Sequence, residues 1–176
     1  MKVPPPVLDR IRSQLWLTAD KEHWPTLPNR RKSALFEQWI RDDQIGGVLS
    51  RYLDSRSVRV YLKDTIMKSY TRDRIKNFAP VTRLLDLPEC PLVSKVYLKP
   101  HGRRLADGKV ICWGLSRDWK TVLMAVFERA HADESAEPFA AVIMFPVGKC
   151  RQPAYRRMIE TASNKLGIQR LEWYEE

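Results

Sequence analysis

Residues 139–147 read Phe-Ala-Ala-Val-Ile-Met-Phe-Pro-Val, a run without a charged side chain. A short and almost continuously apolar segment is typical of a central strand that is buried on both faces. The uncharged stretch that contains it, 138–148, has roughly half the length of a membrane span, so we expect no membrane contact. The segment therefore predicts the middle of a covered β-sheet.

The segments on either side of this strand carry helical patterns. Apolar residues recur every three or four positions in 116–130 and again in 152–166, which predicts one helix before the strand and one after it. Gly167 suits the position just beyond a helix end. Residues 168–174 then predict a last strand.

Two further strand-like segments, 92–98 and 109–113, precede this region, and Asp107-Gly108 in their connection is a hairpin signal. The expected order is β-hairpin–α–β–α–β, which indicates an α/β fold with a mixed sheet, or alternatively an α+β fold. We expect this core to span 57–176. Residues 1–56 would form an N-terminal helical region packed on it, giving one globular domain overall.

The N-terminal part of the chain shows shorter patterns. Helical spacing of apolar residues predicts helices over 7–17 and 33–43, and Gly46-Gly47 predicts a break after the second one. Alternation of apolar and polar residues over 58–63 predicts a half-buried strand. Asp64 would then cap the following helix.

The positive charge is unevenly distributed along the chain. The whole chain has a net charge of +10, and residues 51–120 contain 16 Lys/Arg against 7 Asp/Glu, whereas residues 1–50 contain 8 against 6 and residues 121–176 contain 7 against 8. Positive charge concentrated in one part of a protein is typical of a surface that binds a polyanion. The sequence therefore favours a small basic nucleic-acid-binding protein or accessory subunit that holds DNA or RNA by its phosphate backbone.

One candidate phosphate-binding segment is the connection between the two predicted strands, 99–109. It would project from the sheet edge as a basic loop, with Gly102 allowing a close approach of the backbone. Its candidate contacts are Lys99, His101, Arg103, Arg104 and Lys109.

A second candidate lies in the helix predicted after residue 64. Lys68, Arg72 and Lys76 are spaced by four residues and would follow one helix face. Tyr61 and Tyr70 lie nearby in the sequence and could stack on bases. Contacts of this kind give affinity that depends on salt but not on base sequence.

An enzymatic alternative is a metal-dependent nuclease. Asp107-Gly108-Lys109 reads acid-x-lysine at the start of a strand, with Asp86 upstream. This pattern resembles the restriction-endonuclease-like family, and the resemblance implies Asp86, Asp107 and Lys109 as catalytic residues with Mg²⁺ as the cofactor. Glu37 could be a further ligand. In that family the acid and the lysine lie within the strand, whereas Asp107-Gly108 is typical of a turn.

Other sites and compartments receive less support. The three histidines and the cysteines Cys90, Cys112 and Cys150 lack paired spacing, so we expect no metal site, no cofactor and no disulfide framework. A cytoplasmic, reducing location fits best, since no apolar leader segment is visible. A third reading is a subunit of a larger assembly that binds an acidic protein and no nucleic acid. Trp24, in a proline-rich loop, is the tryptophan with the best chance of exposure. It could anchor a partner, or it could equally fold back onto the domain.

Overall fold

The computed structural model describes residues 3–175, which divide into two compact units, one ending at Lys76 and the other beginning at Asn77. The sequence placed the start of the sheet-containing core at residue 57. The observed division falls later because residues 58–63 belong to the helical unit.

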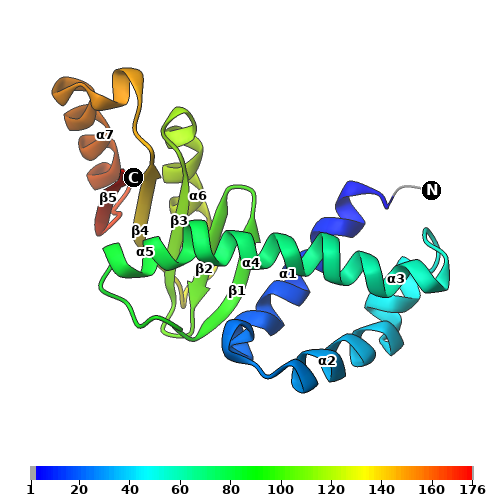
Figure 1. The fold of residues 1–176 in the computed structure, drawn as a ribbon. Helices are drawn as coiled ribbons and strands as arrows, with labels where there is room; N and C mark the ends of the chain where they lie inside the picture. The colour runs from blue at the N-terminus through cyan, green and yellow to red at the C-terminus, as the bar shows by residue number, and fades with distance from the viewer. Residues whose placement is uncertain (1–2, 176) are drawn as a thin grey trace. The chain divides into compact units, whose positions relative to one another are not determined.

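The N-terminal unit consists of helices, drawn in blue to green in Figure 1. In order they are α1 (Pro5–Lys21), the 3₁₀ turn η1 (Trp24–Thr26), α2 (Asn29–Arg41), the π-helical turn η2 (Asp43–Gly47), α3 (Ser55–Tyr61), the π-helical turn η3 (Leu62–Met67) and α4 (Lys68–Asp73). A further π-helical turn, η4 (Arg74–Phe78), contains the boundary between the units.

The strand predicted over 58–63 is wrong, since this segment is helical. Asp54 caps α3, because its Oδ1 accepts hydrogen bonds from the backbone N–H groups of Arg56 and Ser57 at 3.1 and 3.0 Å. Val58 and Leu62, four residues apart, are buried, whereas Val60 is 57% exposed. Burial therefore follows a helical period and not the alternation of a strand.

The break expected at Gly46-Gly47 is confirmed, and it takes the form of the π-helical turn η2. A Cβ on Gly46 would collide with the carbonyl oxygen of Ile40, whereas a Cβ on Gly47 would have no neighbour closer than 3.7 Å. Gly46 is therefore required by close backbone approach at this turn.

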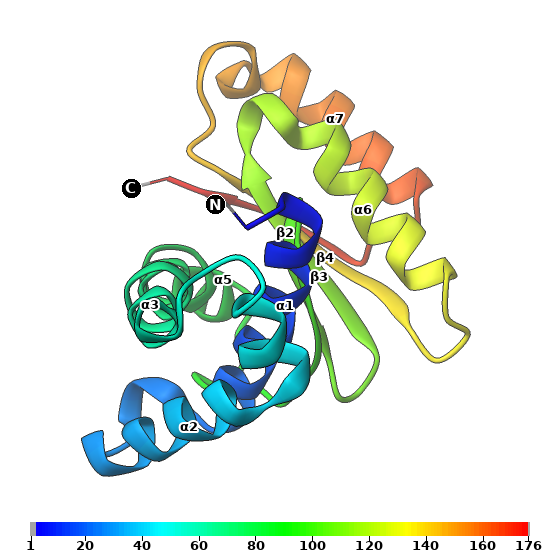
Figure 2. The same cartoon turned by 90° about the vertical axis from the view of Figure 1, so that its right-hand side faces the viewer.

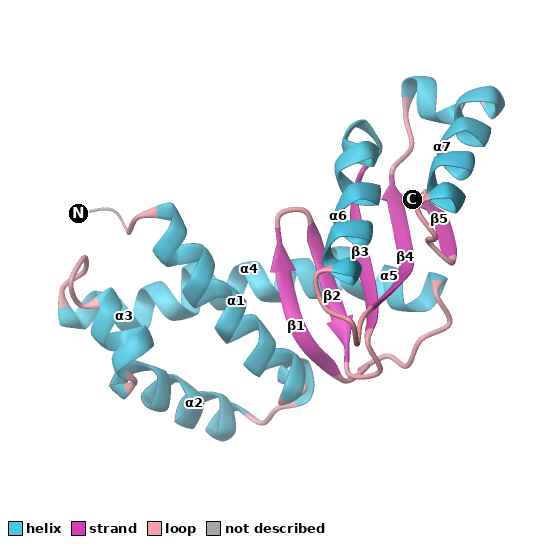
Figure 3. Cartoon of the chain, turned by 180° about the vertical axis from the view of Figure 1, so that it is seen from behind, coloured by secondary structure: helices cyan, strands magenta, loops and turns pink. Residues whose placement is uncertain are grey.

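The C-terminal unit is built around a five-stranded sheet, shown in magenta in Figure 3. Its elements in order are α5 (Ala79–Leu84), β1 (Val93–Leu98), β2 (His101–Leu105), β3 (Lys109–Leu115), the 3₁₀ turn η5 (Ser116–Asp118), α6 (Trp119–His131), β4 (Glu137–Met144), the 3₁₀ turn η6 (Gly148–Arg151), α7 (Pro153–Lys165) and β5 (Arg170–Tyr174).

The strand order is β1-β2-β3-β4-β5, with antiparallel pairing from β1 to β3 and parallel pairing from β3 to β5. The predicted α/β fold with a mixed sheet is confirmed. Figure 2 shows α6 and α7 on the same face of this sheet. The residues of β4 from Ala140 to Met144 are all buried, as expected for a strand covered on both faces.

The basic connection predicted over 99–109 is not a projecting loop. Residues 101–105 form the strand β2, which pairs with β1 on one side and with β3 on the other. The sequence His-Gly-Arg-Arg-Leu has no alternating apolar pattern, so the strand was missed. The helix over 116–130, the helix over 152–166 and the last strand lie close to where they were expected.

Within the described residues, none of the helices combines the length and the apolar character that crossing a bilayer requires.

Candidate nucleic-acid interface

A hollow of about 620 Å³ lies within the helical unit, and we call it the basic groove. Its lining residues come from the Trp24–Thr26 turn, from α2 and from the helical segment 59–71. They are Trp24, Asn29, Lys32, Ser33, Phe36, Arg59, Lys63, Asp64, Met67, Lys68 and Thr71. Among these described lining residues, four are cationic and one is acidic.

The cations of the second wall are aligned by a π-helical turn. Arg59, Lys63 and Lys68 are separated by four and then five residues, and η3 (Leu62–Met67) lies between the first and the last of them. In a regular α-helix a five-residue step would turn a side chain about 140° away. The wider turns of a π-helix, with i→i+5 hydrogen bonds, bring residues five apart close to the same face. The local helix geometry thus places all three cations on the groove.

The opposite wall is the beginning of α2. Lys32 and Ser33 line the groove there, and the Pro28 that precedes the helix provides no side-chain cap. The first turn of α2 contains no acidic residue and carries Arg30 and Arg31. Basic side chains beside the positive end of a helix dipole are unfavourable unless an anion lies near them.

Three aromatic rings, those of Trp24, Phe36 and Trp39, pack together at this wall of the groove. Trp24 is only 7% exposed, with its ring centroid 5.6 Å from that of Trp39 and 5.5 Å from that of Phe36. Of the two alternatives for Trp24, folding back is the one observed, since Trp24 packs onto the Phe36 and Trp39 rings of α2. Lys32 Nζ lies 5.7 Å from the centre of the Trp24 ring, which holds its charge at the groove.

Of the helical residues proposed from the sequence, Lys68 lines the groove. Arg72 and Lys76 are exposed but are not among the described residues that line it. Tyr70 is fully buried, and its hydroxyl donates to Asp20 Oδ1 at 2.8 Å, so the expected stacking on a base is wrong for this residue. Tyr61 is half-buried.

The three basic residues of β2 belong to the C-terminal unit, and each of them has partners within it. Arg103 is completely buried, with its guanidinium carbon 4.9 Å from the centre of the Phe78 ring and 5.4 Å from that of Trp113. An arginine can be buried in this way because its flat, weakly hydrated group stacks on aromatic rings. His101 is half-buried, and its ring stacks on the same Trp113.

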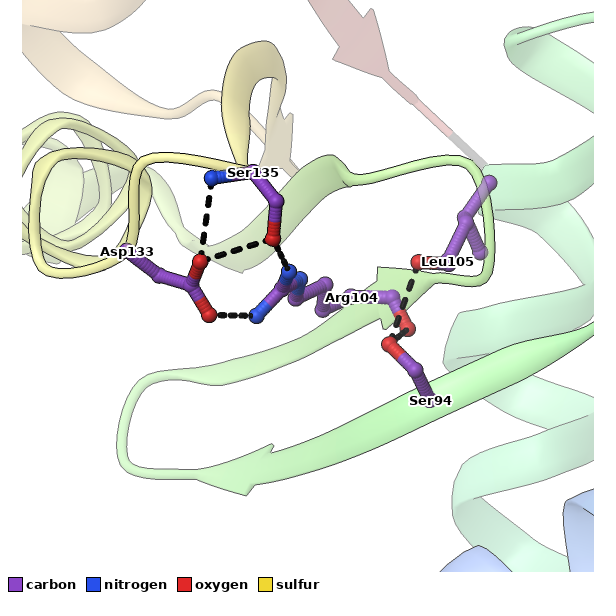
Figure 4. Close-up of polar contacts among 5 residues, drawn as sticks. All are labelled: Ser94, Arg104, Leu105, Asp133 and Ser135. Atoms are coloured by element: carbon purple, nitrogen blue, oxygen red, sulfur yellow. Dashed lines mark hydrogen bonds and ion pairs between the residues drawn. The ribbon is translucent and has the colours of Figure 1, made fainter.

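Arg104 contacts the loop between α6 and β4 (Figure 4). Its guanidinium forms an ion pair with Asp133, and Nη2 donates to Ser135 Oγ at 2.6 Å. Hydrogen bonds from the Ser135 hydroxyl and from Arg104 lower the pKa of Asp133 to about 2. The backbone of β2 is tied to β1 as well, since Ser94 Oγ donates to the carbonyl groups of Arg104 and Leu105 at 3.1 Å each.

The three residues considered for metal-dependent catalysis are engaged in two separate ion pairs. Asp107 and Lys109 pair with each other at 2.7 Å across the β2–β3 turn. Burial opposes ionisation of Asp107, but hydrogen bonds from Lys109 outweigh it and lower the pKa of this carboxyl. Asp86 Oδ2 lies 3.2 Å from Arg170 Nη1.

No group of three or more His, Cys, Asp or Glu side chains suited to a metal ion occurs among residues 3–175. Glu37, the other proposed ligand, forms an ion pair with Arg59 beside the basic groove.

Comparison of this chain with protein-family models, with curated proteins and with solved structures finds no match. Function is therefore inferred from the geometry of the two units.

Sequence reasoning identified one groove cation, Lys68, and did not single out Lys32, Arg59 and Lys63, which line the same groove. The signal that could have found Arg59 and Lys63 was helical spacing through 55–71, which the expected strand obscured. Lys32 could not be found in this way, because it meets the others only through the packing of α2 against α3.

Proposed function

We propose that this protein binds nucleic acid through the basic groove, by contacts to the phosphate backbone. The observation that carries the proposal is the arrangement of Lys32, Arg59, Lys63 and Lys68 around one hollow of the helical unit. Ammonium and guanidinium groups are the usual partners of phosphate oxygens.

The charge of the helical unit supports this proposal. Residues 1–76 contain 16 Lys/Arg against 9 Asp/Glu, a net charge of +7, whereas residues 77–176 contain 15 against 12, a net charge of +3. Most of the excess positive charge therefore belongs to the unit that holds the groove. Such a field raises the local concentration of an anionic ligand and speeds its association.

The dimensions of the groove also suit a phosphate backbone. The nine residue steps from Arg59 to Lys68 span about 13 Å of helix. One strand of a duplex carries about four phosphates over that length, at roughly 3.4 Å of axis each. The first turn of α2 adds backbone N–H groups at the positive end of a helix dipole, which is a favourable place for a phosphate. The proposal extends to DNA and RNA alike, because phosphate contacts do not distinguish base sequences.

We propose a cytoplasmic accessory protein as the setting, in line with three cysteines that, within the described residues, form no disulfide. Strand cleavage is not part of the proposal, since the acids considered for it are occupied by Lys109 and Arg170.

The test is fluorescence anisotropy with a labelled 20-nucleotide duplex and single strand at about 50 mM salt. We expect both to bind, and we expect exchange of Lys63 and Lys68 for glutamate to weaken binding at least tenfold. The control variant exchanges Lys149 and Lys165, two exposed lysines of the C-terminal unit, in the same way and should keep the affinity.

Absence of binding at this salt concentration would refute the proposal. Equal affinity for poly-L-glutamate would also refute it, because the groove would then suit an acidic protein as well as a phosphate backbone.

A further inference from the structure

A second hollow, of about 550 Å³, lies within the C-terminal unit, and we call it the strand-end pocket. It forms where β1, β3 and β4 end, with Leu98, Leu115 and Met144 from those strands in its wall. The beginning of α6 closes it on another side through Thr121 and Val122. The carboxyl ends of parallel strands are where sheets covered by helices usually bind their ligands.

A stack of flat rings forms one part of this pocket. Trp113 lies nearly parallel to Phe78, with ring centroids 5.4 Å apart and planes 16° apart, and to His101, at 6.2 Å and 12°. Phe78 and Trp113 are 1% exposed, whereas His101 is half-buried and lines the pocket together with Trp113. A planar aromatic ligand can therefore extend a stack that the protein has already ordered.

Polar groups of three kinds surround the apolar lining. Asn77 offers an amide, Asp118 a carboxylate and Thr121 a hydroxyl, so hydrogen-bond donors and acceptors are both present. Lys99 adds a positive charge at the turn between β1 and β2. A heteroaromatic ring with polar edges matches a lining that combines apolar and polar side chains.

A smaller hollow of about 420 Å³ adjoins the strand-end pocket, because both are lined by Lys99, Pro100 and Thr121. It adds Lys120 to its lining. Lys99 therefore lies where the two hollows meet, and Lys120 lies in the smaller one. This combination suits a ligand with a flat ring at one end and an anionic group at the other.

We propose that the strand-end pocket binds a single nucleotide unit, with the base parallel to His101 and the phosphate near Lys99 and Lys120. The ligand is either a free nucleotide or one unpaired nucleotide of a strand, since both present the same ring and phosphate. This site belongs to the C-terminal unit, and the proposal stands whether or not the basic groove binds nucleic acid.

The test is titration of the isotope-labelled full chain with adenosine monophosphate, followed by ¹H–¹⁵N NMR. The expected result is saturable shifts of the backbone signals of 98–101 and 113–122. Thr121→Phe, which fills the pocket from the first turn of α6, should weaken binding at least tenfold. The matched control is Thr161→Phe, the same exchange at an exposed threonine of α7, and it should leave the affinity unchanged.

Two further probes examine the base and the phosphate separately. Ribose 5-phosphate, which lacks the base, should bind at least tenfold more weakly, and equal binding would overturn the proposal. Lys99→Gln should weaken binding of adenosine monophosphate several-fold while leaving binding of adenosine unchanged. An equal loss for both ligands would overturn the assigned role of Lys99.

An oligonucleotide distinguishes the two sources of the ligand. If a single strand shifts the pocket signals and the same strand with one abasic position at its centre does so less, a strand nucleotide is the ligand. If the mononucleotide alone shifts them, a free nucleotide is the ligand. If no probe shifts the pocket signals, the proposal of a nucleotide site is overturned. If exchange of Lys63 and Lys68 weakens binding of nucleic acid but leaves the pocket shifts unchanged, the result concerns the basic groove and not the strand-end pocket.

Discussion

Removal of two groove cations should change the salt dependence of binding by a calculable amount. Arg59 is already paired with Glu37, so the count is restricted to the three groove lysines. If Lys32, Lys63 and Lys68 each neutralise one phosphate of a duplex, the slope of log affinity against log salt is about −2.7, and affinity should fall about 40-fold between 50 and 200 mM salt. Exchange of Lys63 and Lys68 for glutamine should reduce the slope to about −0.9, so that affinity falls only about 3.5-fold over the same salt range.

The assay is anisotropy of a labelled duplex at four salt concentrations across that range. The control exchanges Lys149 and Lys165 for glutamine and removes the same charge from exposed positions outside the groove. For this control, the slope of log affinity against log salt should equal that of the unchanged chain. A groove variant with an unchanged slope, or a control that loses as much slope as the groove variant, would refute the assignment of phosphate contacts to these lysines.

Three further predictions concern the fold that presents the sites. Asp54→Ala removes the cap of α3 and should lower the urea concentration at the midpoint of unfolding, and an unchanged midpoint would show that the cap contributes nothing. Gly46→Ala should destabilise by about 1–3 kcal/mol through a collision with the Ile40 carbonyl, whereas Gly47→Ala should not, and equal effects would contradict the close approach. The pKa of Asp133 is lowered from 3.8 to about 2, so its contribution to stability is complete above pH 3.8 and is lost as pH falls towards 2. Asp133→Asn should therefore remove part of the acid dependence of the melting temperature in that range, and an unchanged profile would argue against the ion pair.

The C-terminal half was predictable because its signals are local. The apolar run at 139–147 and the helical spacing of the two flanking segments each determine one element without help from distant residues. Gly167, with a φ of 69°, adopts the left-handed conformation expected beyond the end of a helix.

The two errors in secondary structure, at 58–63 and at 101–105, have different causes. The segment 58–63 fits the periods of both a strand and a helix, and the cap from Asp54 and the burial of Val58 and Leu62 favour the helix. Residues 101–105 carry two arginines and would not be chosen as a strand. These residues form a strand because Arg103 stacks on Phe78 and Trp113 and because Arg104 forms an ion pair with Asp133. All three partners lie outside the segment 101–105.

The basic groove was only partly predictable for the same reason. The excess of positive charge was visible, but its division between two units was not. Which cations share one surface depends on a π-helical turn and on the packing of α2 against α3. Neither feature can be predicted from charge counts or from regular helical spacing.

Lysine footprinting would show which lysines of the chain lie against a bound duplex. The chain would be acetylated with and without a saturating 20-nucleotide duplex, and the modification of each lysine would be measured by mass spectrometry. We expect strong protection of Lys32, Lys63 and Lys68 and no protection of Lys149 and Lys165. Protection spread evenly over all five lysines, or confined to the last two, would contradict a binding surface at the groove.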